Sequence, residues 1–190
     1  MSLRRFPQRT LRGATEIYRI HRSSKSAWWF SADGSGRFDP VGTGQGGCYF
    51  ADKPIGAWVE VFRKRMLLAE DEVLERSLYR AKLGRDLRLA DVTSRRALQF
   101  GITASIGASE DYTESHTFAA DALAAGFAGI RYLVHHDPAQ RLYGFALFGQ
   151  AGESVPVANP KGWKSSDGPI PDDLVSEARL LFEYRVLPTP

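Results

Sequence analysis

Two isolated arginines and one glutamate are the residues of this chain whose setting most favours chemistry. Arg19 lies in the middle of an alternating segment, residues 16–22, where Ile17 and Ile20 are apolar. A charged side chain on an apolar strand is costly unless it is paired or binds a ligand. We therefore interpret Arg19 as a ligand-binding residue. The structural alternative is an arginine that reaches solvent at the edge of a sheet.

Arg37 stands in a glycine-rich segment, residues 31–47, between Gly36 and Phe38. Small neighbours let a ligand approach the backbone, and a guanidinium can bind phosphate oxygens through two hydrogen bonds. Two such arginines would fit a pyrophosphate. The alternative for Arg37 is a local ion pair with Asp39.

Glu60 lies in the middle of a predicted helix, one turn after Gly56. Helical side chains lean toward the N-terminus, so we expect Gly56 to leave a notch over which the Glu60 carboxylate could act. The alternative is an exposed glutamate that pairs with Lys64 four residues later. Tyr49, in the strand predicted before this helix, could stack on a flat heteroaromatic ring, hydrogen-bond a ribose, or simply belong to the core.

Several familiar arrangements are absent from the sequence. His135 and His136 end a predicted strand, and adjacent residues of an extended chain point to opposite faces, so they are poor co-ligands for one metal ion. The four histidines and one cysteine show no metal-ligand spacing, so no metal is expected. The glycines of residues 42–47 precede a strand rather than a helix, which excludes a dinucleotide-binding turn.

Interspersed strands and helices must position these side chains. Apolar and alternating segments predict strands at residues 16–22, 47–51, 77–83, 87–90, 127–134 and 142–148. Helical spacing predicts a helix that begins at Pro54 and buries a face running to Met66, and others at residues 93–100, 114–125 (capped by Thr113) and 172–182. Since a strict βαβ rhythm is missing, we predict an α+β fold: a curved, mixed or mostly antiparallel sheet with surrounding helices.

The composition is that of a globular protein, with 190 residues of which 43% are apolar and 25% charged. The single cysteine, Cys48, permits no intramolecular disulfide and suits a reducing compartment, so we expect a cytoplasmic protein. No signal peptide or membrane span is expected. The net charge is only +3, but residues 1–22 carry six arginines against one glutamate, which favours an anionic partner.

We predict a domain over residues 1–150, followed by residues 151–190 as a linker and a C-terminal helix that packs on the same domain. The basis is the stretch of residues 149–171, which is rich in glycine, proline and serine.

The ordered motifs resemble the RES-domain family. The matching pieces are Tyr18-Arg19-Ile-His-Arg22, Trp28-Trp-Phe-Ser31, Gly36-Arg-Phe-Asp39, Cys48-Tyr-Phe-Ala51, Glu60, Gly129-Ile-Arg-Tyr132, His136-Asp-Pro138 and Ala146-Leu-Phe148. The resemblance spans about residues 12–150 and leaves residues 150–190 outside.

RES-domain proteins are toxins of bacterial toxin–antitoxin pairs. They are similar in fold to ADP-ribosyltransferases and consume NAD⁺ by hydrolysis, phosphorolysis or ADP-ribosyl transfer. The resemblance therefore implies NAD⁺ as the substrate, cleaved at its nicotinamide–ribose bond, and an antitoxin protein as a partner. It implies that Arg19 and Glu60 are catalytic. The residues expected to bind NAD⁺ are Arg37, Tyr49, Tyr18, His135 and His136.

One signature position departs from the family. RES-domain proteins often have a serine two positions after the tyrosine of the Ile-Arg-Tyr strand, and this position is Val134 here. His135 or His136 could take over a polar contact. Alternative functions are an ADP-ribosyltransferase that modifies a protein or nucleic acid, and a catalytically degenerate interaction protein. A basic nucleic-acid-binding module is a further alternative, although no such motif is recognised. The acceptor and a homo-oligomeric state stay open.

Overall fold

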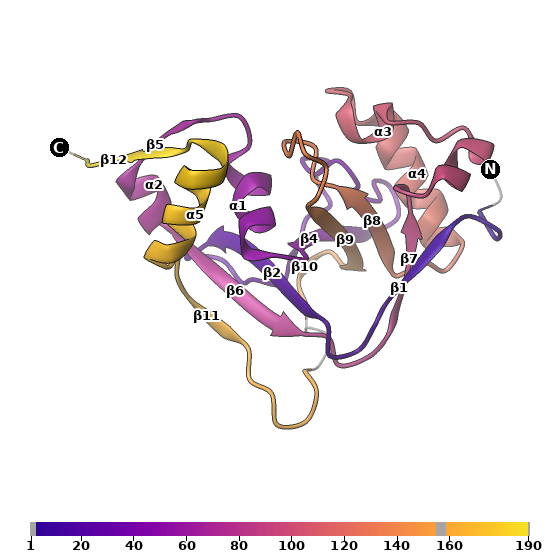
Figure 1. The fold of residues 1–190 in the computed structure, drawn as a ribbon. Coiled ribbons are helices and arrows are strands. Elements are labelled where there is room, and N and C mark those ends of the chain that lie inside the picture. Colours follow the sequence, from indigo (N-terminus) through magenta and orange to yellow (C-terminus); the bar gives the residue numbers. More distant parts are fainter. Residues whose placement is uncertain (1–2, 155–158, 190) are drawn as a thin grey trace.

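An eight-stranded sheet organises the fold in the computed structural model, which describes residues 3–154 and 159–189 (Figure 1). Its strand order is β1-β7-β8-β9-β4-β2-β6-β11, and neighbouring strands are antiparallel except for the parallel pair β7 and β8. The strands are β1 (Gln8–Leu11), β2 (Glu16–Arg22), β4 (Gln45–Ala51), β6 (Arg76–Lys82), β7 (Leu87–Asp91), β8 (Gly129–Leu133), β9 (Tyr143–Gln150) and β11 (Ser166–Pro169). Two small sheets pair β3 (Trp29–Phe30) with β10 (Gly152–Glu153), and β5 (Leu67–Ala69) with β12 (Arg185–Leu187).

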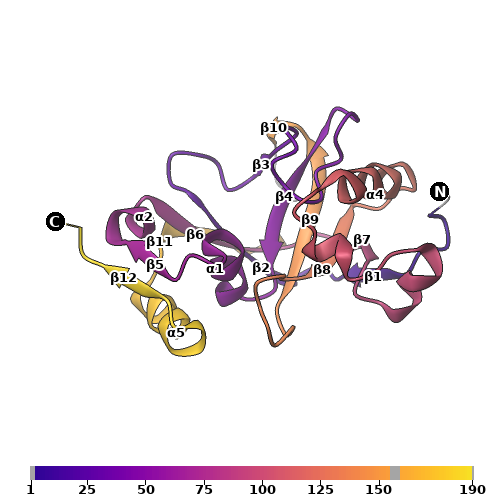
Figure 2. The ribbon, with the colours of Figure 1, turned by 90° about the horizontal axis from the view of Figure 1, so that it is seen from above.

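The helices form two groups toward opposite ends of the sheet (Figures 1 and 2). One group contains α1 (Pro54–Phe62), α2 (Glu70–Leu74) and α5 (Asp172–Phe182). The other contains a 3₁₀-helix, η1 (Arg95–Phe100), with α3 (Ser105–Ala108) and α4 (Thr113–Ala124). The predicted α+β class, with a mostly antiparallel sheet and surrounding helices, is confirmed. Within the described residues, no helix is long and apolar enough to cross a membrane.

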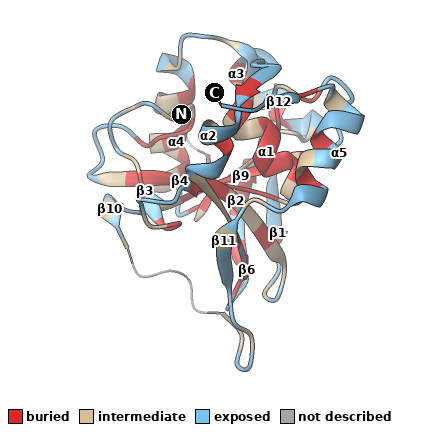
Figure 3. Ribbon diagram, turned by 90° about the vertical axis from the view of Figure 1, so that its left-hand side faces the viewer, coloured by how far each residue is buried: buried red, intermediate tan, exposed pale blue. Residues whose placement is uncertain are grey.

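Helix α1 is the most deeply buried helix of the group that also contains α2 and α5 (Figure 3). Pro54 occupies its first turn, where the missing N–H leaves no hydrogen bond unmade. Trp58 and Phe62 are fully buried and pack in one cluster with Leu174 and Ala178 of α5. The C-terminal helix thus contributes to the same core that holds α1 against the sheet.

Several limits of helices and strands differ from the predictions. Thr113 is the first residue of α4 rather than its cap, because Tyr112 occupies the N-cap position without a side-chain cap hydrogen bond. Helix α1 ends at Phe62, because Arg63 turns the chain with a φ of 52°, and Met66 is 40% exposed rather than on a buried helical face. The predicted linker contains a strand, β11, which pairs antiparallel with β6 at the edge of the main sheet. Its sequence gives no strand signal because a short edge strand, ending here in Pro169, is held through its backbone and has no apolar alternation.

Candidate active site

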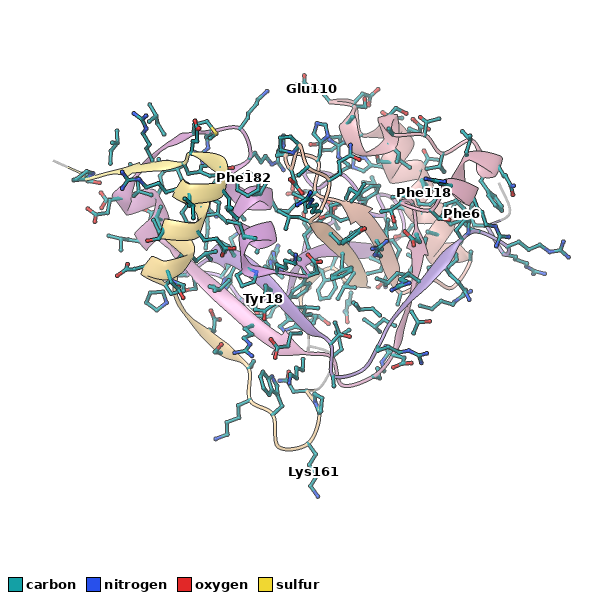
Figure 4. The ribbon with its side chains drawn as sticks, viewed as in Figure 1. Phe6, Tyr18, Glu110, Phe118, Lys161 and Phe182 are labelled. Atoms are coloured by element: carbon teal, nitrogen blue, oxygen red, sulfur yellow. The ribbon has the colours of Figure 1, made fainter. Side chains whose placement is uncertain are left out.

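A cavity of about 450 Å³ collects all seven residues that the sequence analysis assigned to the site. Its walls come from strands β2, β4 and β8, the start of β6, the glycine-rich loop before β4, helices α1 and α3, the segment between α3 and α4, and the turn after β8. On β2, Tyr18 lies between the two groups of helices (Figure 4). The seven residues are Arg19, Glu60, Arg37, Tyr49, Tyr18, His135 and His136.

Arg19 extends from an interior strand, since β2 lies between β4 and β6. Its Nη1 donates hydrogen bonds to the carbonyl oxygens of Ala27 at 2.7 Å and Trp29 at 3.2 Å, and also contacts the sulfur of Cys48. Within the described part of the chain, its Nε and Nη2 have no protein hydrogen-bond partner. The sheet-edge alternative is therefore wrong. The guanidinium is fixed through one nitrogen and keeps its other donors for a ligand.

Arg37 is held by backbone carbonyls from another part of the chain. Its Nη1 donates to the Ser109 oxygen at 2.6 Å and the Ile106 oxygen at 3.5 Å, and its guanidinium lies 4.5 Å from the ring centre of Tyr112. No ion pair joins Arg37 to Asp39 in the described residues. The local-pair alternative is wrong, and the fixed guanidinium contributes positive charge to the cavity.

Tyr49 secures the loop that carries Arg37. Its hydroxyl donates to the buried carboxylate of Asp39 at 2.8 Å and accepts from the Phe38 N–H at 2.8 Å. A Cβ on Gly36 or Gly47 would overlap the Asp39 carboxylate, so glycine is required at both positions. Since the hydroxyl is already engaged, only the Tyr49 ring is free to contact a ligand. Its predicted hydrogen bond to a ribose is not favoured, whereas stacking stays a prediction.

Glu60 faces the cavity through ordinary helical spacing. Ala57, Glu60 and Val61 stand at i, i+3 and i+4 on α1, and all three line the cavity. Gly56 does not line it. A Cβ at Gly56 would lie 3.0 Å from the Ala51 Cβ, so this glycine permits close packing of α1 on β4. The predicted notch at Gly56 is wrong, and the small residue one turn before Glu60 on the cavity side is Ala57.

The environment of Glu60 favours a protonation change near neutral pH. The Lys64 Nζ lies 3.9 Å from the Glu110 Oε1, so Lys64 pairs with Glu110, and the alternative of a Glu60–Lys64 ion pair is wrong. Burial raises the pKa of Glu60 to about 6, and Arg63 and the Tyr132 hydroxyl partly offset this effect. At pH 7 and above, the carboxyl is mainly ionised.

His135 and His136 do not point to opposite faces, contrary to the expectation for a strand. Strand β8 ends at Leu133, and the two histidines occupy a turn in which their ring centres lie 5.0 Å apart. Both line the cavity. Burial and the neighbouring His135 lower the pKa of His136, which favours its neutral form. Among the residues that the structure describes, no group of three or more His, Cys, Asp or Glu could hold a metal ion.

Several residues of the cavity were not predicted from the sequence, namely Ser35, Arg63, Arg76, Gly107, Tyr112, Tyr132 and Leu133. The helical spacing of apolar residues places Arg63 on the solvent-exposed side at the C-terminus of a helix. Nothing in the sequence around Arg76, at the start of a strand, indicates a ligand-binding residue. Arg63 and Arg76 decide the charge of the site, because four guanidinium groups and one carboxylate, that of Glu60, line the cavity. This balance fits a ligand with two or more negative charges.

A protein-family model matches most of the chain. The family model of the RES domain matches residues 16–171. The chain belongs to the RES-domain family. The match passes beyond residue 150, where the sequence resemblance was expected to end, and therefore includes β11, while α5 and β12 lie beyond it.

A solved structure shares the fold of this RES-domain chain. It is the crystal structure of the M. tuberculosis MbcT-MbcA toxin–antitoxin complex, with a TM-score of 0.62 and 19% sequence identity. The match covers 90% of this chain and 92% of that chain. At this identity the likeness concerns the fold. Comparison with curated proteins gives no match.

Val134, at the position where the family often has serine, does not line the cavity of this RES domain. It is 1% exposed and belongs to the apolar cluster shared by α1 and α5. The polar groups that the adjoining turn offers to the cavity are the rings of His135 and His136. In this chain the departure from the family therefore changes a core position.

Proposed function

We propose that this RES-domain chain is an enzyme that cleaves the nicotinamide–ribose bond of NAD⁺, as the toxin of a toxin–antitoxin pair. The observation that carries the proposal is the convergence of four guanidinium groups and the Glu60 carboxylate on one cavity. NAD⁺ offers a pyrophosphate to the arginines and, beside it, a ribose that gains positive charge during cleavage. Family membership and the likeness to a toxin–antitoxin complex support the same reading.

Arg19 and Arg37 are proposed to bind the pyrophosphate. Backbone carbonyls already fix one guanidinium nitrogen of each residue, so little side-chain freedom is lost when the ligand binds. Donors held in place before the reaction also stabilise charge without reorganisation during it. In this role the two arginines orient the scissile bond relative to Glu60.

Glu60 is proposed to stabilise the sugar cation. When the bond breaks, its electron pair leaves with nicotinamide as a neutral base, and positive charge develops at the anomeric carbon, as in other glycosidic cleavages. The ionised carboxylate offsets that charge. Water then adds to the carbon and releases a proton, so that hydrolysis yields ADP-ribose, nicotinamide and one proton. Phosphate or a macromolecule would take the place of water in phosphorolysis or ADP-ribosyl transfer.

The decisive experiment compares purified parent, Glu60→Gln and the exposed control Glu110→Gln in their consumption of NAD⁺, followed by mass spectrometry. We expect the parent and the control to consume NAD⁺ and Glu60→Gln to lose at least about 100-fold in rate. The products identify the acceptor: free ADP-ribose, a phosphorylated ADP-ribose in phosphate buffer, or labelled macromolecules in lysate. Consumption by Glu60→Gln at the parental rate would contradict the proposed role of Glu60.

The toxin proposal has its own test in cells. Induced expression of the parent should lower cellular NAD⁺ and arrest growth of a bacterial host, and Glu60→Gln should do neither. Co-expression of a neutralising antitoxin protein should restore growth. Arrest by both variants to the same degree would separate toxicity from NAD⁺ cleavage and reject this proposal.

A further inference from the structure

We infer that Tyr132 is a positioning residue whose hydroxyl holds the Glu60 carboxylate in its working orientation. The inference deepens the proposed NAD⁺-cleaving function and rests on it for its catalytic meaning. Tyr132 extends from β8 into the cavity, although the residue is only 6% exposed. Its hydroxyl oxygen is buried without any hydrogen-bond partner in the described residues.

An unpartnered buried hydroxyl is rare in proteins, because it loses its hydrogen bonds to water and gains none in return. A phenylalanine at position 132 would avoid this loss while keeping the ring. The cost of the hydroxyl is therefore consistent with a function in the cavity rather than with packing.

The ring of Tyr132 is fixed on both sides. Its centre lies 5.1 Å from that of Phe38, in the loop that carries Arg37. On β9, a Cβ at Gly144 would lie 2.5 Å from the Tyr132 Cε2, so the ring lies directly on the glycine backbone. A ring held in this way presents its hydroxyl at one place, which suits a group that orients another side chain.

The acidic group that Tyr132 faces is Glu60. Burial and, after it, the charge of Glu60 raise the pKa of Tyr132 well above its usual value, and the Tyr132 hydroxyl in turn lowers the pKa of Glu60. Arg63, at the end of α1, and Arg37, in the glycine-rich loop, also act on both groups. The other titratable groups of the cavity are Tyr18, Arg19, Tyr49, Arg76, Tyr112, His135 and His136.

The expected action follows from this geometry. The two side chains line one cavity and act on each other's pKa, but they form no aligned hydrogen bond, so we expect a rotation of the Glu60 side chain to bring its carboxylate onto the phenolic O–H. A donated hydrogen bond stabilises the ionised carboxylate and restricts its rotation. Tyr132 thereby acts on the reaction through Glu60.

The test is Tyr132→Phe, with the Glu60 carboxyl titrated by NMR of carboxyl-labelled glutamate and its resonance assigned with Glu60→Gln. We expect the pKa of Glu60 to rise by about 0.5 unit or more, because a stabiliser of its ionised form is lost. The acid limb of kcat/KM for NAD⁺ should move to higher pH by the same amount. At pH 7.5, kcat should fall roughly tenfold while KM changes less than about twofold.

Stability and a matched control complete the experiment. At pH 4.5, where the Glu60 carboxyl is protonated, Tyr132→Phe removes only an unpartnered hydroxyl, so its Tm should equal or exceed that of the parent. Tyr143→Phe is the control, since Tyr143 lies outside the cavity with its ring 3.6 Å from the Arg131 guanidinium, and it should leave the Glu60 titration and the kinetics unchanged.

Two outcomes would overturn the inference. An unchanged Glu60 titration with a raised KM would make Tyr132 a direct ligand contact, and an unchanged titration with a lowered Tm would make it a structural residue. The titration needs no turnover. If the parent fails to consume NAD⁺, the proposed function fails, while the coupling of Tyr132 to Glu60 is still decided by NMR.

Discussion

Tyr49 on β4 donates a 2.8 Å hydrogen bond to the buried carboxylate of Asp39, and this contact ties the central sheet to the loop that carries Arg37. In Tyr49→Phe, the carboxylate loses a donor and the Phe38 N–H loses its acceptor. We expect the free energy of unfolding in urea to fall by about 1–3 kcal/mol. The KM for NAD⁺ should rise as well, because Arg37 loses its support. Equal stability and equal KM in parent and variant would show that the contact does not hold the loop.

The same contact depends on glycine at position 47. In Gly47→Ala the new Cβ would lie 2.5 Å from the Asp39 Oδ1 and 3.3 Å from the Tyr49 ring. The free energy of unfolding should fall by about 1–3 kcal/mol, as for other overpacked sites. Gly168→Ala is the matched control, because a Cβ on this β11 glycine meets nothing within 4 Å. A Gly47→Ala variant as stable as the control would refute the packing argument.

Arg37→Lys tests the geometry of phosphate binding rather than its charge. Lysine keeps the positive charge but loses the planar fork that reaches two oxygens, as well as the hydrogen bond to Ser109 and the stacking on Tyr112. KM for NAD⁺ should rise roughly tenfold, which corresponds to about 1.4 kcal/mol of binding free energy. Arg96→Lys, an exposed position in η1, should change nothing. Initial rates over a range of NAD⁺ concentrations provide the comparison.

The raised pKa of Glu60 predicts opposite pH dependences of activity and stability. Turnover should fall as pH drops through about 6, because the working carboxyl becomes protonated. Stability has the other sign. The folded-state pKa of Glu60 lies above the usual value of 4.5, so the folded state binds the proton more tightly than the unfolded state. This contribution to stability is complete below pH 4.5 and is lost as pH rises through about 6. The shift corresponds to at most about 2 kcal/mol.

The Glu60→Gln variant separates these effects, because glutamine cannot ionise. The difference in Tm between this variant and the parent should favour the variant more at pH 7.5 than at pH 4, while its NAD⁺ turnover is severely reduced at pH 7.5. Scanning calorimetry at the two pH values gives the comparison. The same Tm difference at both pH values would show that the Glu60 carboxyl is not destabilised by burial.

Val134→Ser tests whether a serine at position 134, where RES-domain proteins often have one, would contribute to NAD⁺ cleavage in this chain. Because the Val134 side chain lies in the apolar core and outside the cavity, a serine there should not raise NAD⁺ turnover. It should lower the free energy of unfolding by about 1–3 kcal/mol, since a hydroxyl is buried and two methyl groups are lost. A gain in turnover would mean that the β8 turn rearranges to present position 134 to the ligand.

The periodicity of apolar residues was sufficient to predict the limits of helices and strands that bury one face. The predicted limits of residues 16–22 and 172–182 agree with β2 and α5, whose apolar residues recur at strand and helix spacing. Strands β1, β3, β5, β10, β11 and β12 were not predicted. They are short and lie at edges of the main sheet or in the two small strand pairs, where backbone pairing rather than side-chain pattern holds them.

Seven residues that line the cavity could be named from the sequence, but the contacts that hold them in place could not. Arg19 and Glu60 stand out because charged groups interrupt apolar patterns. The carbonyls that fix Arg37 come from residues 106 and 109, about seventy positions away, and no local rule connects them. Likewise, the turn that brings His135 beside His136 depends on where β8 ends, which is the kind of boundary that a sequence leaves uncertain.

The excess of positive charge in the cavity has a practical consequence for ligand discovery. Four arginines against one glutamate repel one another in the empty protein, so any compact polyanion that enters should raise the melting temperature. Hits in a thermal-shift screen would then rank by charge rather than by base or sugar. Tripolyphosphate at matched ionic strength is therefore the reference compound, and only nucleotides that exceed it report recognition of the nucleoside.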